Sequence, residues 1–405
     1  MNKSTPRVII VHPDRQHSLQ TAKYLQENGY LYKYYTTVYL KKYSISKILY
    51  YLAPKSIRRK FDKHYLDTLD DNKIHLKCEF QMLLLSLIAP FIGNKTYESR
   101  RKQIIESFNK RVLNDCLKDD FDCLISFDTL SSDCFLPLKE KGVKIVLDMS
   151  APCLLSMVDH FKEDIDRFPS TSHALNEYLD SEKLKWTLSN CKKELTTYDF
   201  FFAASTYTKD TLMENGVDEK KIILLPYGIN VQPQLIKRSH KTFTCIYVGS
   251  VTQQKGCHYI FRYAKELPDV RFILIGAYDH SYNEIPSNCE LKGYLSFPEI
   301  KQYLADSDMF IFLSLSDGFG FAPLEGMSMG LPVISSKYAG IRDFVDGSGW
   351  IVSPEDKDRI INIIKEMKSN PSELNYRKEQ AFAKANSVVW EEYSERLCHF
   401  ITSAI

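Results

Sequence analysis

Two carboxylates and several glycines lie close together in residues 314–332, SLSDGFGFAPLEGMSMGLP. Asp317 and Glu325 are eight positions apart. We expect Asp317 on a loop and Glu325 in the first turn of the next helix, both facing one cleft, where carboxylate oxygens can accept hydrogen bonds from sugar hydroxyls. The glycines that follow Asp317 permit close approach of a ligand to the backbone. Pro323 predicts the first turn of a helix, whose free amides suit an anionic or hydroxyl-rich ligand. The structural alternative is that Asp317 caps a turn and Glu325 complements the helix dipole.

A second candidate site lies in residues 248–267, VGSVTQQKGCHYIFRYAKEL. Gly249 ends a predicted strand, and Lys255 stands where the next helix begins, so its charge and the free amides together can hold a diphosphate. Alternatively, Lys255 is an exposed lysine in a turn. The phosphate-loop order GxxxxGK[ST] is absent, and no GxGxxG follows the first strand of either half of the chain, which argues against a nicotinamide or flavin cofactor.

The first half of the chain offers fewer candidates. His12 and His17 lie at the end of the first predicted strand, and another predicted strand ends at Asp148. Both strand ends are expected to face the cleft. We take His17 as a candidate catalytic residue and Asp148 as a polar residue that can face the cleft. The alternatives are that His17 belongs to the first turn of a helix and that Asp148 is the N-cap of the next one.

Short apolar, β-branched segments alternate with helical patterns along the whole chain, which predicts an α/β fold of two open, doubly wound parallel sheets. In such sheets ligands bind beyond the carboxyl ends of the strands. The predicted strands of the first half are residues 7–12, 30–37, 123–128, 144–149, 200–205 and 222–228. Those of the second half are residues 243–249, 271–277, 289–295, 309–315, 332–337 and 349–354.

The chain of 405 residues is too long for one hydrophobic core, so we expect two Rossmann-like domains that face a cleft. Residues 230–242 are polar and lack a period, and they are the predicted linker. The predicted domains are residues 1–229 and 230–385. Residues 386–405 form an amphipathic terminal helix that is expected to cross back to the first domain.

The composition is that of an ordinary globular protein, with 44% hydrophobic and 26% charged residues. The net charge of +2 argues against a nucleic-acid-binding protein. No two of the ten cysteines have metal-site or redox-pair spacing, and the sequence passes directly into a strand without a signal-like segment. We therefore expect reduced thiols, no bound metal and a cytoplasmic protein.

Residues 33–63 form a basic segment with nine Lys or Arg, one acid and six tyrosines. Cations and amphipathic rings together suit an anionic membrane surface, which predicts peripheral attachment at the inner face of a membrane. The alternative is a solvated surface with a few anchoring tyrosines.

These motifs, together with NGVDEKKIILLPYGIN at residues 215–230, resemble the family 4 retaining glycosyltransferases of GT-B architecture. The resemblance covers most of the chain and is strongest from about residue 198 onward. It implies that Glu325 binds the nucleotide ribose and that Lys255 carries the diphosphate charge. The further residues that it implies for donor binding are Gly249, Ser250, Gly293, Tyr294, Gly318, Phe319, Gly320 and Phe321, with Gly293 and Tyr294 at the base. The resemblance places Asp317 beside the sugar and Asp148 near the reacting carbon, so the candidate catalytic residues are Asp317, Asp148 and His17.

The sequence departs from the family pattern at two positions. Asp317 replaces the first glutamate of the usual pair, and Ser250 begins a loop that lacks the usual arginine, so another residue is needed to complete phosphate binding.

The resemblance implies transfer of a sugar from a nucleotide sugar, UDP-linked rather than GDP- or ADP-linked, to a hydroxyl of a glycan or lipid-linked acceptor in surface polysaccharide or glycolipid assembly. Transfer would retain the anomeric configuration and need no cofactor or metal. The alternatives are a non-catalytic nucleotide- or glycan-binding protein and a GT-B nucleotide-sugar epimerase.

Overall fold

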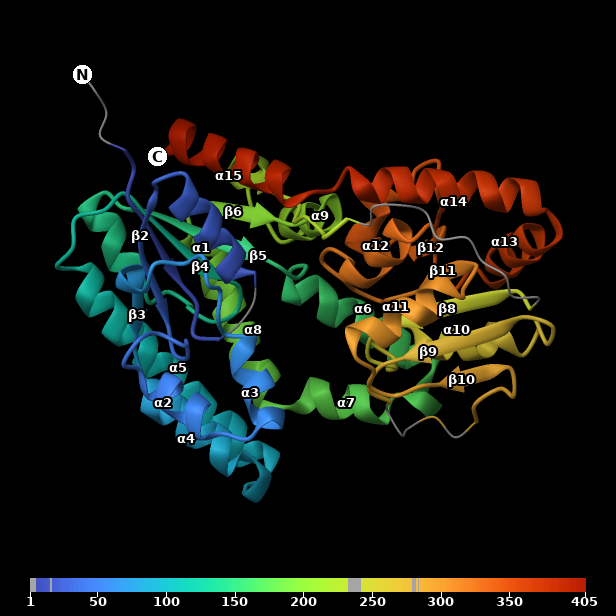
Figure 1. Ribbon diagram of the computed structural model, residues 1–405, viewed down its shortest axis with the longest axis horizontal. Coiled ribbons are helices and arrows are strands. Elements are labelled where there is room, and N and C mark those ends of the chain that lie inside the picture. The colour runs from blue at the N-terminus through green and yellow to red at the C-terminus, as the bar shows by residue number, and fades with distance from the viewer. Residues whose placement is uncertain (1–4, 15–16, 232–241, 279–281, 283) are drawn as a thin grey trace.

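Two parallel β-sheets form the frame of the protein (Figure 1). The computed structural model describes residues 5–14, 17–231, 242–278, 282 and 284–405. The seven-stranded sheet has the order β3-β2-β1-β4-β5-β6-β7, and the six-stranded sheet has the order β10-β9-β8-β11-β12-β13. In each sheet the chain reverses its winding direction once, between β1 and β4 and between β8 and β11. These two positions are where a doubly wound sheet is expected to bind ligands.

All twelve predicted strands are present, and the predicted α/β class is confirmed. The strands are β1 (Val8–Val11), β2 (Leu31–Thr36), β3 (Ile74–Leu76), β4 (Cys123–Phe127), β5 (Lys144–Met149), β6 (Phe200–Ala203), β7 (Ile222–Leu224), β8 (Thr244–Val248), β9 (Arg271–Ile275), β10 (Cys289–Leu291), β11 (Met309–Phe312), β12 (Val333–Ser336) and β13 (Trp350–Val352). The prediction missed β3, because this edge strand has only three residues and a histidine at its centre.

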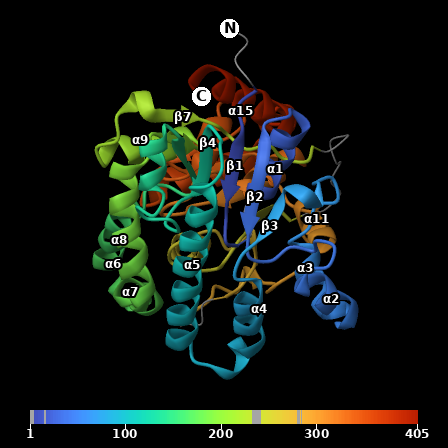
Figure 2. The same cartoon turned by 90° about the vertical axis from the view of Figure 1, so that its left-hand side faces the viewer.

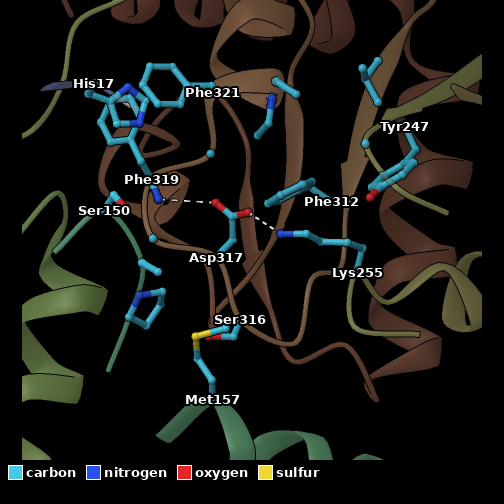
Figure 3. Close-up of a pocket in the computed structure, with 18 residues that line it drawn as sticks. His17, Ser150, Met157, Tyr247, Lys255, Phe312, Ser316, Asp317, Phe319 and Phe321 are labelled. Carbon is cyan, nitrogen blue, oxygen red and sulfur yellow. Dashed lines mark hydrogen bonds and ion pairs between the residues drawn. The ribbon is translucent and has the colours of Figure 1, made fainter. Parts of the chain in front are cut away.

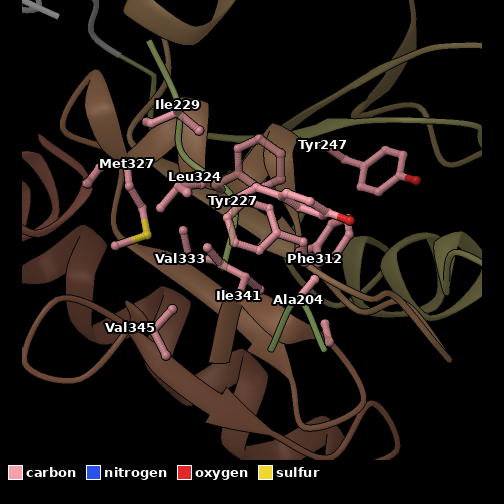
Figure 4. Close-up of a cluster of buried hydrophobic side chains, with 14 of the residues drawn as sticks. Ala204, Tyr227, Ile229, Tyr247, Phe312, Leu324, Met327, Val333, Ile341 and Val345 are labelled. Atoms are coloured by element: carbon pink, nitrogen blue, oxygen red, sulfur yellow. The ribbon is translucent and has the colours of Figure 1, made fainter. Parts of the chain in front are cut away.

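The strands are mainly apolar because helices cover both faces of the sheets (Figure 1 and Figure 2). Alternate residues of β1 enter different cores: Val8 and Ile10 belong to one cluster of buried side chains, Ile9 and Val11 to another. The first of these clusters continues into the second domain, where it includes Tyr247 (Figure 4). The hydrophobic core therefore joins the two domains.

The helices complete the layers. They are α1 (Ser18–Glu27), α2 (Ile45–Leu52), α3 (Lys55–Asp62), α4 (Glu79–Ile88), α5 (Asn94–Cys116), α6 (Leu154–Arg167), α7 (His173–Asp180), α8 (Glu182–Thr197), α9 (Thr206–Glu214), α10 (Cys257–Ala264), α11 (Phe297–Ala305), α12 (Phe321–Ser328), α13 (Lys357–Ser369), α14 (Pro371–Asn386) and α15 (Trp390–Ala404), with short 3₁₀ turns between some of them. Among the helices of the described residues, none combines the length and the apolar character needed to cross a bilayer.

The terminal helix α15 lies on the first domain, as expected (Figure 1). Its Tyr393 hydroxyl is 2.7 Å from Thr21 Oγ1 in α1, and Phe400 packs edge-on against Phe202 of β6. The chain that enters α15 passes directly against the chain that leaves β7. A Cβ at Gly228 would lie 2.2 Å from the backbone nitrogen of Trp390, so only glycine allows this approach. The boundary predicted at residue 230 stays a prediction, since residues 232–241 of the predicted linker lie outside the described residues.

Helix α15 follows the second domain and lies on the first, and helix α6 does the reverse. It follows β5 of the first domain and reaches the second domain (Figure 1). Asp164 of α6 is buried and accepts hydrogen bonds from Gln253 Nε2 at 2.7 Å and from the Tyr259 hydroxyl at 2.8 Å. His258 Nε2 lies 3.1 Å from the same carboxylate. Burial opposes ionisation of Asp164, but these partners outweigh it and lower its pKa.

Candidate active site in the cleft between the domains

A pocket of about 380 Å³ lies at the β8/β11 reversal and is lined by both domains (Figure 3). The second domain contributes the ends of β8 and β11 and the loop that enters α12, and the first domain contributes His17 and the loop after β5. The lining residues are His17, Ser150, Ala151, Pro152, Met157, Tyr247, Val248, Gly249, Lys255, Phe312, Ser316, Asp317, Gly318, Phe319, Gly320, Phe321, Ala322 and Pro323.

Asp317 is held in the pocket by its own backbone and by one cation. Its amide donates to the Tyr338 carbonyl at 3.0 Å, and its carbonyl accepts from the Gly340 amide at 2.9 Å. The side chain accepts from the Phe319 amide at 3.3 Å through Oδ1 and from Lys255 Nζ at 2.7 Å through Oδ2 (Figure 3). The carboxylate therefore has a fixed direction toward the pocket and a compensating positive charge.

Lys255 lies in the turn before α10 and points into the pocket rather than into solvent (Figure 3). Among the described residues that line the pocket, it is the only Lys or Arg. Its side chain retains 30% exposure, so an incoming anion can reach it. The structure thus brings together Lys255 and Asp317, which are 62 positions apart in the sequence.

His17 faces the second domain from the start of α1. Its ring stacks on Phe321 at 4.8 Å between centroids and packs on Tyr227 at 4.2 Å. Beside it, the loop after β5 touches the loop after β11, where a Cβ at Gly318 would lie 2.3 Å from the Ser150 carbonyl oxygen. The pocket is therefore closed on this side by a direct contact between the domains.

Some residues predicted for donor binding do not line this pocket. Glu325 lies in the second turn of α12, not in the first as expected, because the helix begins at Phe321. It is half-buried, and burial raises its pKa against the opposing effect of Lys301. Ser250 is exposed, and Tyr294, next to Gly293 at the end of the β10 segment, is 85% exposed.

Asp148 is buried beneath the cleft and is not among the residues that line the pocket. Its Oδ1 accepts a hydrogen bond from the Tyr227 hydroxyl at 2.8 Å. Burial raises the pKa of Asp148 to about 7. The same Tyr227 ring contacts His17, so this tyrosine links Asp148 to the pocket.

A second, polar pocket of about 460 Å³ lies at the β1/β4 reversal. Of its lining residues, the sequence predicts only His12 at the cleft, because the others are scattered along the chain up to residue 130. The pocket is lined by His12, Asp14, His64, Arg101, Asp128, Thr129 and Leu130. Arg101 of α5 forms an ion pair with Asp14. Asp128 Oδ1 accepts a hydrogen bond from the Ser150 hydroxyl at 3.2 Å, and burial raises the pKa of Asp128 to about 6. Ser150 lines the first pocket and donates to Asp128 of the second pocket, so the two pockets are neighbours.

Two facing Rossmann-like domains with a pocket between them define the GT-B architecture. Residues 231–384 match the family model described as glycosyl transferases group 1. The resemblance to GT-B glycosyltransferases predicted from the motif residues is thereby confirmed, together with the fold class.

The lipopolysaccharide outer core galactosyltransferase WaaB has a similar structure, with a TM-score of 0.62, 14% identity and coverage of 98% of this chain and 100% of that one. HepE from Anabaena in complex with UDP also has a TM-score of 0.62, with 12% identity and coverage of 98% and 100%. At these identities the likeness concerns the fold.

Among curated proteins, the chain is similar to the putative colanic acid biosynthesis glycosyltransferase WcaL of Escherichia coli K12. The two are 25% identical over 181 residues, which cover 39% of this chain and 45% of WcaL. The chain spans about half the length of the curated relatives it matches.

Proposed function

We propose that this protein is a retaining glycosyltransferase that moves a sugar from a nucleotide diphosphate sugar to a hydroxyl of a glycan or lipid-linked acceptor in polysaccharide assembly. The observation that carries the proposal is the Lys255–Asp317 pair at the β8/β11 reversal. The pair lies beyond the carboxyl ends of β8 and β11. A cation there can stabilise a diphosphate leaving group, and a carboxylate can stabilise the positive charge that develops on the sugar. The named activity of WcaL supports the same class.

In the proposed reaction the diphosphate lies against Lys255 and the amides at the start of α12. As the bond from the anomeric carbon to the phosphate oxygen breaks, Lys255 and these amides stabilise the charge that develops on the leaving oxygen. Asp317 stabilises the oxocarbenium-like sugar. The acceptor hydroxyl attacks from the same face, and its proton passes to the departing phosphate oxygen, so the configuration at the anomeric carbon is retained.

The acceptor is proposed to occupy the polar pocket at the β1/β4 reversal. Its lining carboxylates, histidines and arginine can hydrogen-bond to sugar hydroxyls, and Ser150 connects it to the donor pocket. Contact between the Ser150 and Gly318 loops limits the entry of water, which would otherwise hydrolyse the donor.

The donor is proposed to be a UDP-sugar, because HepE, which has a similar fold, is described in complex with UDP. Thermal unfolding with UDP, GDP and ADP tests this assignment. A nucleotide at a hundredfold its dissociation constant adds about 2.7 kcal/mol to the free energy of unfolding. UDP is expected to raise the melting temperature most. If none of the three nucleotides stabilises the protein, the assignment of this pocket to the donor is wrong. If a nucleotide binds but no sugar is transferred to any acceptor, a non-catalytic binding protein is favoured instead.

A further inference from the structure

Helix α2 has its apolar side turned away from the protein. Ile45, Ile48 and Leu52 follow one another at helical spacing and are all exposed, with Leu52 at 77%. The residue that α2 buries is a serine, Ser46. A surface helix normally does the reverse, so the exposed stripe is not explained by the fold of this chain.

Helix α4 and the short 3₁₀ turn η2 (Ala89–Phe91) carry a second exposed stripe. Phe80, Leu84, Leu87 and Phe91 recur every three or four residues and are all exposed, with Phe91 at 86%. The opposite side of α4 is buried in the domain. Helices α2 and α4 are in direct contact, since Glu79 at the start of α4 accepts hydrogen bonds from Ser46 at the start of α2.

The charges around these stripes are mainly positive. Lys42 and Lys55 are exposed at the two ends of α2, and Arg100 is exposed on α5 beside α4. Three acids contact this region through hydrogen bonds: Asp71 accepts from the Lys42 amide at 2.7 Å, Glu79 accepts from the Ser46 amide at 2.7 Å, and Asp62 accepts from the Tyr50 hydroxyl. The apolar stripes are therefore bordered by exposed cations that a ligand in solvent can reach.

We propose that this α2–α4 face, made of the exposed apolar residues of α2, α4 and η2 with Lys42, Lys55 and Arg100, binds the surface of a membrane that contains anionic lipids. Apolar side chains enter the headgroup region while lysine and arginine contact lipid phosphates, as in interfacial helices. A second copy of the chain is disfavoured as the occupant, because a twofold interface would bring the same cations together.

The position of the face supports this occupant. Helices α2 and α4 follow the carboxyl ends of β2 and β3, at the edge of the sheet that carries the polar pocket (Figure 2). An acceptor held in a membrane would thus reach the cleft from the bound surface. Membrane binding itself does not depend on the proposed transfer reaction.

The face differs from the one expected from residues 33–63. Tyr34, Tyr35 and Tyr39 are buried in the domain and do not face solvent, so half of the tyrosines in that segment are core residues. The exposed apolar residues of the α2–α4 face belong to α2, which lies inside residues 33–63, and to α4 and η2, which lie outside them.

Vesicle flotation of the full chain, without nucleotide, tests the proposal. The protein is expected to float with vesicles of phosphatidylglycerol and phosphatidylcholine and to stay at the bottom with phosphatidylcholine alone. The triple variant Leu52→Gln, Leu87→Gln, Phe91→Ser is expected to bind at least about tenfold more weakly. All three side chains are exposed, so circular dichroism should be unchanged. The control is Met213→Gln with Tyr376→Ser, two exposed apolar residues on other helices.

The electrostatic part is tested with Lys42→Glu and Lys55→Glu, compared with the exposed lysines in Lys220→Glu and Lys365→Glu. Only the first pair is expected to weaken binding, and added salt should weaken binding of the wild type. Equal binding of the triple variant and the wild type, or failure of the wild type to bind anionic vesicles, would overturn the proposal. A concentration-dependent dimer that the triple variant abolishes would assign the face to a second copy instead.

Discussion

Lys255 Nζ lies 2.7 Å from Asp317 Oδ2, so the only lysine lining the described pocket is already paired with its carboxylate. Both side chains keep partial exposure, at 30% and 20%. An ion pair this accessible contributes about 1 kcal/mol or less to stability, so it is available for exchange with a ligand. A diphosphate that approaches Lys255 competes with Asp317 for the same charge, which links donor binding to the direction of the carboxylate.

Replacing Lys255 by methionine should weaken nucleotide diphosphate binding by about tenfold or more, because a charge-assisted hydrogen bond contributes about 1.5–3 kcal/mol. Isothermal titration calorimetry measures the loss. The control is Lys357→Met, which removes a surface lysine paired with Glu266 on the same domain. Equal affinity of the Lys255 variant and the wild type would contradict a phosphate-binding role.

Asp317→Asn should lower the transfer rate by about a hundredfold, the scale of losing one preorganised electrostatic group in an active site. Nucleotide binding should be retained or become tighter, since Lys255 no longer has a carboxylate partner. Steady-state kinetics and calorimetry on the same preparation separate the two effects. A variant that loses donor binding and keeps its rate at saturation would assign Asp317 to binding alone.

Gly318→Ala should reduce activity without large loss of stability in either domain. The added Cβ would lie 2.3 Å from the Ser150 carbonyl oxygen, so the two loops must separate. The matched control is Gly93→Ala, where nothing lies within 4 Å of the added atom. Small-angle scattering should detect a more open molecule for the Gly318 variant. Identical scattering and activity for the two variants would contradict the importance of this contact.

Stability should depend on pH through Asp148, whose pKa is raised by burial from 3.8 to about 7. The folded protein binds this proton more tightly than the unfolded chain does. The contribution to the free energy of unfolding is therefore fully present below about pH 4 and is lost as the pH rises through about 7. Asp148→Asn should make the melting temperature less dependent on pH in this window. The control is Asp346→Asn at an exposed position. An unchanged pH profile for Asp148→Asn would show that the carboxyl group is ionised in the folded state.

The sheets and the donor-side loops could be predicted because their signals are local. Buried parallel strands are continuous apolar segments, and Asp317 and Lys255 each follow such a strand within a few residues. The polar pocket could not be predicted, since Asp14, Arg101 and Asp128 meet only after the sheet has formed. The interdomain contacts of Asp164 likewise depend on where α6 ends in space. The exposed stripe of α4 could not be predicted either. The buried and the exposed side of this helix are both hydrophobic, so the sequence does not show which side faces solvent.

The close approach of Gly228 to Trp390 has a consequence for motion. The segment that leaves the first domain after β7 and the segment that returns to it before α15 lie against each other at Gly228 and Trp390. Both connections between the domains therefore share one hinge point. Helix α6 meets the second domain on the other side of the interface (Figure 1). Rotation of the domains about this hinge point must then pull Asp164 away from Gln253, His258 and Tyr259. Opening of the cleft by such a rotation would therefore break these buried hydrogen bonds.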